Sequence, residues 1–307
     1  MLTIHNPDHH LHQGRHEMFR GRLVPCHETP QRLDHVLAEL QRRALAPLRT
    51  PTGDDDALDA ALAQIHDPRY LHFIEHAWNE WIALDVSNAE RDALPSVWPA
   101  PGMRRDLLPD NFAARMGLFS FDAGTPLTAG SWIAARAGAA CAVEAAREVS
   151  HGAVRAAFAL SRPPGHHAGR DFFGGYCFLN NAALAVQALR DGGAPRVAVL
   201  DVDYHHGNGT QAIFYERADV LTVSIHGNPM TEYPFFPRPR RRARRGRGRR
   251  LQPEPAAATR HRLRTLARGL AHRTRGNPPL RCRCLGGRAR RRHVQGRSDF
   301  GLPAAQR

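Results

Sequence analysis

Two short segments of this sequence each contain an adjacent pair of histidines, and the second also contains two aspartates. The first segment is Arg162-Pro-Pro-Gly-His-His-Ala168, and the second is Asp201-Val-Asp-Tyr-His-His-Gly-Asn-Gly-Thr210. Imidazole groups exchange protons near neutral pH, and imidazole and carboxylate groups together bind transition-metal ions. The two segments therefore predict acid–base chemistry beside a bound metal ion.

The second segment has the residue types of a metal site. Asp201, Asp203 and His205 alternate with other residues, so an extended backbone would direct all three side chains to one face. Carboxylate and imidazole ligands suit Zn²⁺, which in catalytic sites usually has three protein ligands and one position for water. The alternative is a strand end that presents Asp and His to solvent. The glycine turn at residues 207–209, which no core requires, favours the metal site.

The first segment supplies candidate bases. His166 and His167 are adjacent at a predicted loop tip, and Pro163 and Pro164 restrict the backbone that leads to them. A solvated pair of surface histidines is the alternative interpretation. Gly174-Gly-Tyr-Cys-Phe-Leu-Asn-Asn181 follows within a few residues and adds permissive glycines and an aromatic side chain. These neighbouring residues favour a functional role for His166 and His167.

Both segments begin where a predicted strand ends. Short apolar runs at residues 156–160 and 197–200 have the composition of strands, and a third strand is expected at 220–225. Alternation of strands with helices indicates an α/β fold with a central parallel sheet, which binds ligands at the carboxyl edge of its strands. The other expected elements are an edge strand at 1–4, a polar loop at 5–25 and a loop-rich region at 83–126. A helix is expected after the cap at Thr29-Pro30, with apolar positions from 33 to 40, and further helices are expected at 58–65, 70–82, 131–149, 181–190 and around 212–216.

The size and composition of the chain are those of a globular protein. It has 307 residues, of which 42% are hydrophobic, enough for one large α/β domain. No basic and apolar leader begins the sequence and no apolar run reaches membrane length, so we expect a soluble cytoplasmic protein without a membrane partner. The five cysteines lack the spacing of a disulfide framework, which indicates reduced thiols.

The net positive charge of this sequence comes entirely from its C-terminal part. Residues 1–237 contain 20 Arg against 27 Asp and Glu, whereas residues 238–307 contain 23 Arg against 2 acidic residues. One interpretation is a basic arm that binds nucleic acid, because clustered Arg neutralises phosphates. The absence of Lys and of interleaved aromatic residues, and the abrupt start of the run, favour a disordered or frameshifted tail instead.

Three motifs together carry a family resemblance. R-P-P-G-H-H-A, F-G-G-Y-C-F-L-N-N-A-A and D-V-D-Y-H-H-G-N-G-T-Q, in this order and spacing, resemble the arginase/histone deacetylase superfamily, and most of all its bacterial acetylpolyamine amidohydrolases. The resemblance implies a three-layer α/β fold with a central parallel sheet, here incomplete at the C-terminus. It also implies zinc-dependent hydrolysis of an N-acetyl amide, on an acetylpolyamine or an acetyl-lysine-like substrate, to acetate and a free amine.

The resemblance assigns roles to the residues of both segments. It implies that His167 is the general base toward the attacking water and that His166 is its electrostatic partner or an acid. Asp201 is then expected to orient His166, and Asn208 to orient His167. Because Asn208 stands where many histone deacetylases have Asp, we expect His167 to be a weaker base than in those relatives.

The metal sites implied by the resemblance are only partly present in this sequence. Asp203 and His205 match two zinc ligands, whereas the third ligand, an Asp, and a tyrosine from a late glycine-rich loop have no counterpart. Asp201 and Ser224 match the family's inner site for a monovalent cation, so K⁺ is a further expected cofactor. We therefore expect Zn²⁺, and possible binding of K⁺, in an incomplete site.

Substrate binding and assembly are also implied by the resemblance. Tyr176 and Tyr233 are expected to line the tunnel for the acyl group, and ordinary half-buried aromatic residues are the alternative. Glu17 matches an acidic rim residue suited to a cationic substrate, although a single acidic residue in a loop is usually only solvated. The N-terminal insertion of such enzymes helps to pair two subunits, which implies a homodimer.

The resemblance ends at Phe236 and divides the chain into a deacetylase-like part at 1–236 and a tail at 237–307. Permitted codons for residues 250–258 and 292–300, read one base later, can encode segments that resemble the missing family sequence. A frameshift near the codons for 236–240 is therefore our interpretation, and impaired activity is its consequence. The alternatives are an inactive protein that binds an acetylated ligand and a nucleic-acid-associated protein with a genuine basic tail.

Overall fold

The structure is a computed structural model that describes residues 1–45 and 47–236. The predicted disordered or frameshifted tail at 237–307 lies outside the described residues. Within them, the chain forms seven α-helices and parallel and antiparallel strand pairs. None of these helices is long and apolar enough to cross a lipid bilayer. Cys26, Cys141 and Cys177 are free thiols.

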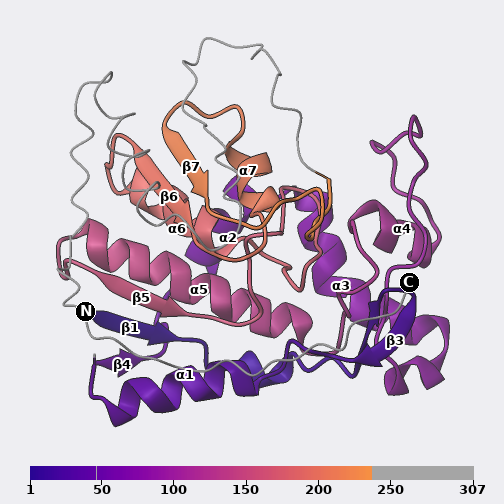
Figure 1. Cartoon of the computed structure of the whole chain (residues 1–307), viewed down its shortest axis with the longest axis horizontal. Helices are drawn as coiled ribbons and strands as arrows, with labels where there is room; N and C mark the ends of the chain where they lie inside the picture. Colours follow the sequence, from indigo (N-terminus) through magenta and orange to yellow (C-terminus); the bar gives the residue numbers. More distant parts are fainter. Residues whose placement is uncertain (46, 237–307) are drawn as a thin grey trace, which may run out of the picture. The chain divides into compact units, whose positions relative to one another are not determined.

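Three parallel strands form the sheet that precedes the first histidine segment. β1 (Leu2–His5) lies between β4 (Leu48–Arg49) and β5 (Ala157–Leu160), as Figure 1 shows. The expectation of an edge strand at 1–4 is therefore wrong. The reason is that β4 is only two residues long, and so short a strand has no recognisable sequence pattern of its own.

Helices cover both faces of this sheet. On one face, Leu33 and Leu40 of α1 (Gln31–Arg42) pack with Leu160 of β5. On the other face, Cys141 and Ala145 of α5 (Ser131–Ser150) pack with Ile4 of β1. Because side chains alternate along a strand, the apolar residues of β1 and β5 divide between the two helices and create three layers. α1 and α5 lie on opposite sides of the strands in Figure 1.

A second pair of parallel strands carries the second histidine segment. β6 (Val197–Asp201) pairs with β7 (Val220–Ser224), and Asp201 lies opposite Ser224 at the end of the pair. Val197 and Val199 pack against the main core, as alternation along a strand requires. α7 (Asn208–Phe214) lies between the two strands in the chain. The predicted α/β class and its parallel strands are thus confirmed.

The main core lies among the helices. α2 (Asp55–Ile65), α3 (Pro68–Leu84), α4 (Phe112–Leu118) and α6 (Asn181–Asp191) bury an aromatic and aliphatic cluster together with α5. Asp54 and Asp67 cap α2 and α3, because each side chain accepts a hydrogen bond from a main-chain N–H of the first turn. These caps explain why each helix begins before the predicted start at 58 or 70.

The N-terminal loop expected at 5–25 contains a hairpin instead. β2 (His16–Phe19) and β3 (Arg22–Pro25) pair antiparallel, and a short helix, η1 (His9–Leu11), precedes them. Arg20 and Gly21 have φ values of 50° and 77°, as a two-residue hairpin turn requires. The prediction of a loop was wrong because the strands are only four residues long and their burial is inverted: Glu17 is buried, whereas Phe19 and Leu23 are exposed. A second short helix, η2 (Val86–Glu90), follows α3.

Candidate active site

The loop after β5 carries His166 and His167 and is held by main-chain hydrogen bonds. The N–H groups of Gly209 and Thr210, at the start of α7, both donate to the His166 carbonyl at 3.1 Å. The Asn180 side-chain amide donates to the Ala168 carbonyl at 2.8 Å. The two histidine segments are therefore joined at the strand ends, as the sequence predicts.

His166 pairs with the carboxylate that ends β6. Its Nδ1 lies 2.9 Å from Oδ2 of Asp201, and both side chains are largely buried. Burial acts to raise the pKa of Asp201, but the hydrogen bond and charge of His166 outweigh it, so the net pKa is lowered. An ionised Asp201 accepts the Nδ1 proton of His166, which leaves Nε2 of His166 directed toward Asp203, 3.9 Å from its Oδ1.

His167 pairs with a neutral amide instead. Its Nδ1 lies 2.6 Å from Oδ1 of Asn208, and the residue is 3% exposed. Burial, with the charge of His166 adding to it, lowers the pKa of His167 to about 3, against the opposing hydrogen bond to Asn208. The imidazole is therefore neutral near pH 7. With its Nδ1 proton donated to Asn208, it has a lone pair on Nε2 that can accept a proton.

Asp203 and His205 lie in a turn rather than in the extended segment that the spacing predicts. The strand ends at Asp201, whose Oδ1 accepts a hydrogen bond from the Asp203 N–H at 3.1 Å. Asp203 Oδ1 likewise accepts from the His205 N–H at 2.7 Å. These side-chain to main-chain bonds compete with the extended backbone and turn the chain, so the predicted extended geometry is wrong.

The turn nevertheless brings two metal-ligand atoms together. His205 Nδ1 lies 3.4 Å from Asp203 Oδ1. Two donors with bonds of 2.0–2.2 Å at a tetrahedral angle are about 3.4 Å apart, so this pair fits one zinc ion. Within residues 1–45 and 47–236, no further His, Cys, Asp or Glu atom completes a group of three with this pair.

Tyr233 lies edge-on against two histidines of the site. Its ring centroid is 5.0 Å from that of His167 and 5.8 Å from that of His205. Its hydroxyl donates to Asp122 Oδ2 at 2.5 Å, and the Gly175 N–H donates to the same oxygen at 2.6 Å. Burial raises the pKa of Tyr233, and the charge of Asp122 adds to this, so the phenol stays protonated.

Asp122 was not among the predicted site residues. It is one of six acidic residues in the loop-rich region at 83–126, and no neighbouring motif marks it. Its role as a common acceptor for Tyr233 and Gly175 is visible only in the folded chain.

The other two predicted substrate residues contact each other. The Tyr176 hydroxyl donates to Glu17 Oε1 at 2.9 Å. Glu17 is 2% exposed, and its carboxylate also accepts hydrogen bonds from the N–H and Nδ1 of His27. The alternative interpretation, that Glu17 is only a solvated loop residue, is therefore wrong. The hairpin of β2 and β3 turns the Glu17 side chain inward.

The predicted monovalent-cation residues are neighbours across β6 and β7. Asp201 and Ser224 are register partners, so their side chains leave the strand pair on the same face. Ser224 Oγ lies 2.8 Å from Nδ1 of His226. The two residues are thus brought together, and their role toward K⁺ stays a prediction.

Two glycines are required by close contacts within the site. Gly175 has φ of +56°, and a Cβ there would lie 2.3 Å from Cδ2 of His167. A Cβ at Gly207 would lie 2.2 Å from Oδ2 of Asp201. Larger residues at these positions would displace the His167 ring or the carboxylate of Asp201.

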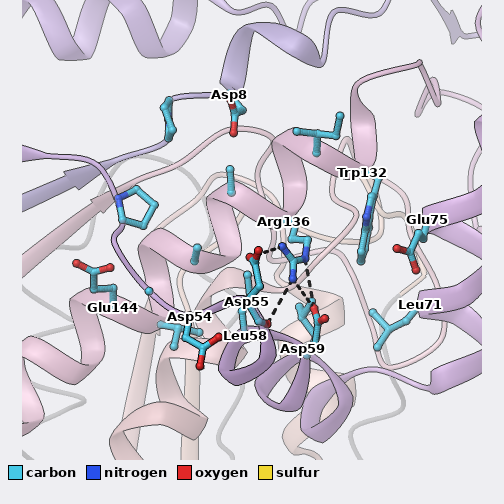
Figure 2. Close-up of a pocket in the computed structure, with 18 of the residues that line it drawn as sticks. Asp8, Asp54, Asp55, Leu58, Asp59, Leu71, Glu75, Trp132, Arg136 and Glu144 are labelled. Carbon is cyan, nitrogen blue, oxygen red and sulfur yellow. Dashed lines mark hydrogen bonds and ion pairs between the residues drawn. The ribbon is translucent and has the colours of Figure 1, made fainter.

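A cavity of about 600 Å³ lies elsewhere, between α2, α3 and α5. In Figure 2 the Arg136 guanidinium points toward two of its carboxylates, and it donates to Asp55 and Asp59 at 2.7 Å each. None of the predicted site residues lines this cavity. The acidic residues that line it are Asp8, Asp54, Asp55, Asp59, Glu75 and Glu144.

Comparison with known families and proteins gives a consistent result. The family described as histone deacetylase domain matches residues 26–266. Acetylpolyamine amidohydrolase 2 of Pseudomonas aeruginosa is 50% identical over 236 residues, which cover 77% of this chain and 66% of that protein. Acetylpolyamine amidohydrolase of Mycoplana ramosa is 41% identical over 238 residues, covering 77% of this chain and 67% of that protein.

A solved structure supports the same similarity. The crystal structure of acetylpolyamine aminohydrolase from Burkholderia pseudomallei matches with a TM-score of 0.74 and 37% sequence identity. The match covers 84% of this chain and 72% of that one. The alignments with acetylpolyamine amidohydrolases 1 and 2 of Pseudomonas aeruginosa span 66% of the length of each relative.

Proposed function

Because this chain belongs to the histone deacetylase domain family, we propose that it is a zinc-dependent amidohydrolase that removes the acetyl group from an N-acetyl amine. Enzymes of this family are typically metal-dependent. Acetylpolyamines are the substrate class to test first, because relatives of this chain bear the name acetylpolyamine amidohydrolase. Acetyl-lysine is the second class. Water and the amide yield acetate and a free amine.

The different partners of the two adjacent histidines support this proposal most directly. His166 contacts the carboxylate of Asp201, whereas His167 contacts the neutral amide of Asn208. Adjacent groups with partners of different charge are typical of acid–base pairs. We assign His167 as the base that takes a proton from the attacking water at Nε2. His166 stabilises the developing charge or donates a proton to the departing amine.

Asp203 and His205 would hold the zinc ion, and their 3.4 Å separation supports this assignment. The chemistry that zinc supplies when bound is polarisation of the amide carbonyl and a lower pKa of the attacking water. Asp201 and Ser224 would contribute to a K⁺ site behind His166. Tyr176 and Tyr233 would flank the acyl group, and Glu17, through Tyr176, would favour a cationic substrate.

Two ligands are fewer than the three that catalytic zinc sites usually have. We therefore propose weak zinc binding and low turnover for the chain in its present form. A frameshift after Phe236 remains our explanation, although it concerns residues outside those described. Sequencing the gene around the codons for 236–240 tests it: a one-base difference that restores family-like sequence is expected, and an unchanged frame would contradict it.

The principal test of the proposal measures acetate release and bound zinc in parallel. In a form with the family-like frame restored, His167→Ala should abolish acetate release from an acetylated polyamine while zinc stays bound. Asp203→Ala and His205→Ala should both lose zinc. His151→Ala, at an exposed position, is the matched control and should change neither quantity. Retained turnover in His167→Ala would refute the assignment of His167 as the base. Stoichiometric zinc in Asp203→Ala or His205→Ala would refute the assignment of that residue as a zinc ligand.

The two alternative functions give different results. An inactive binder of an acetylated ligand would be stabilised by the acetylated amine without releasing acetate. A nucleic-acid-associated protein would bind DNA with a strong salt dependence that disappears when residues 238–307 are deleted. A homodimer, which we also propose from the resemblance, would be detected by analytical ultracentrifugation. Fractionation of cells tests the expected cytoplasmic localisation.

A further inference from the structure

Two histidines and an aspartate converge on one point at the start of the chain. His9 and His10 belong to η1, and Asp34 lies in the first turn of α1. The Nε2 atoms of His9 and His10 lie 3.0 and 2.8 Å from the same oxygen, Oδ1 of Asp34. Over residues 1–45 and 47–236, these are the side chains that bring three potential metal-ligand atoms within 4.8 Å of one another. None of them belongs to the candidate active site.

The contacts of His9 indicate that a cation belongs between His9 and Asp34. The Nδ1 atom of His9 lies 3.0 Å from the main-chain oxygen of Asn6, which can only accept, so Nδ1 carries a proton. In a neutral ring, Nε2 then has a lone pair, and it faces the carboxylate oxygen of Asp34. Two acceptors at 3.0 Å repel each other unless a second proton or a metal ion lies between them.

A metal ion can take the place of the proton between His9 and Asp34. The His9 side chain is 6% exposed, and the Arg162 guanidinium donates to the His9 carbonyl oxygen. A protonated His9 would satisfy its own contact with Asp34, and a neutral His10 could donate to the same oxygen, whereas a metal ion would bind all three ligand atoms at once. A ligating histidine almost always donates its other ring N–H to a carbonyl or carboxylate oxygen, as His9 does toward Asn6.

The ligand atoms lie close enough to accept a metal ion after a small movement of the side chains. At a tetrahedral zinc ion, two donors with bonds of 2.0–2.1 Å are about 3.4 Å apart. The observed separations are 3.0 and 2.8 Å, so the ligand atoms would move apart by about 0.5 Å on binding. The side chains of His10 and Asp34 are 58% and 40% exposed, so they can adjust and leave room for water as a further ligand.

We propose that His9, His10 and Asp34 form a second transition-metal site, separate from the active site, that binds Zn²⁺ or a similar divalent ion. Two imidazoles and a carboxylate are a common ligand set for such ions. The bound ion would join η1 to α1. Because the His9 carbonyl accepts from Arg162, the same ion would also stabilise the start of the segment that carries His166 and His167.

The test is a zinc titration of the full chain after removal of metal with a chelator. Asp203→Ala/His205→Ala is the parent background, so that the proposed active-site ligands do not contribute. Calorimetry should detect one zinc ion per chain in this background. His10→Ala and Asp34→Asn should each weaken binding at least about tenfold. His35→Ala, an exposed histidine beside Asp34, is the matched control and should bind as the parent does.

A second measurement guards against loss of folding in a variant. Zinc should raise the unfolding temperature of the parent and of His35→Ala, but not that of His10→Ala, whose exposed side chain is not needed for the core. The proposal is overturned if the parent binds no zinc. It is equally overturned if His10→Ala binds zinc as tightly as His35→Ala does.

Discussion

Lowering the pH should destabilise this fold through His66, a buried histidine that helps to position the active-site loops. His66 is 0% exposed, and its Nε2 accepts a hydrogen bond from the Asn180 N–H at 3.1 Å. Asn180 in turn caps α6 and donates to the carbonyl of Ala168, next to His167. A protonated imidazole cannot accept this hydrogen bond, so protonation of His66 works against the native contact.

The size and sign of the effect follow from the pKa of His66. Burial lowers this pKa from 6.5 to about 4 in the folded chain. The folded protein therefore binds a proton at His66 less readily than the unfolded chain does. The stability that neutral His66 contributes is present above pH 6.5 and is lost as the pH falls toward 4. Linkage predicts a loss of about 2 kcal/mol in the free energy of unfolding between about pH 8 and about pH 5.

Urea unfolding followed by tryptophan fluorescence at several pH values measures this loss. His66→Gln keeps a side-chain acceptor but does not titrate, so its stability should fall by about 2 kcal/mol less than that of the wild type over the same interval. His35→Gln, at an exposed position, should retain the wild-type pH dependence. If His66→Gln and the wild type lose equal stability on acidification, the assignment of this effect to His66 is wrong.

Three further substitutions test contacts around the site. Glu28→Gln should lower the free energy of unfolding by about 3–5 kcal/mol in urea titrations, because Arg162 loses its buried carboxylate partner. A loss below about 1 kcal/mol would show that the Glu28–Arg162 pair contributes no more than a surface pair. Asn180→Ala should speed hydrogen exchange in the first turn of α6, which loses its cap, and unchanged protection would contradict the role. Gly175→Ala should reduce acetate release at least about tenfold by displacing His167, and wild-type turnover would exclude that displacement.

Local sequence patterns were sufficient to predict most of the regular structure. Strands were expected at 156–160, 197–200 and 220–225, and the structure has them at Ala157–Leu160, Val197–Asp201 and Val220–Ser224. The helix expected at 131–149 spans Ser131–Ser150. These elements are predictable because apolar spacing and capping residues act within a few positions along the chain.

Elements with weak local signals were not predicted. The hairpin of β2 and β3 buries Glu17 and exposes Phe19 and Leu23, which is the opposite of the usual pattern. The two-residue strand β4 acquires its structure only by pairing with β1. The bend after Asp201 was also unexpected. There, hydrogen bonds from main-chain N–H groups to the carboxylates of Asp201 and Asp203 override the extended conformation that alternation predicts.

The sequence by itself determined which residue types are available for chemistry and at which strand ends they lie. His166, His167, Asp201, Asp203, His205 and Asn208 all come from two segments that could be recognised without coordinates. Only the tertiary structure decided which of the dispersed polar residues meet. Tyr233 with Asp122, Tyr176 with Glu17, and His9 and His10 with Asp34 are brought together across intervals of 24 to 159 residues. Contacts at such separations depend on how helices and strands pack, and no local pattern encodes that packing.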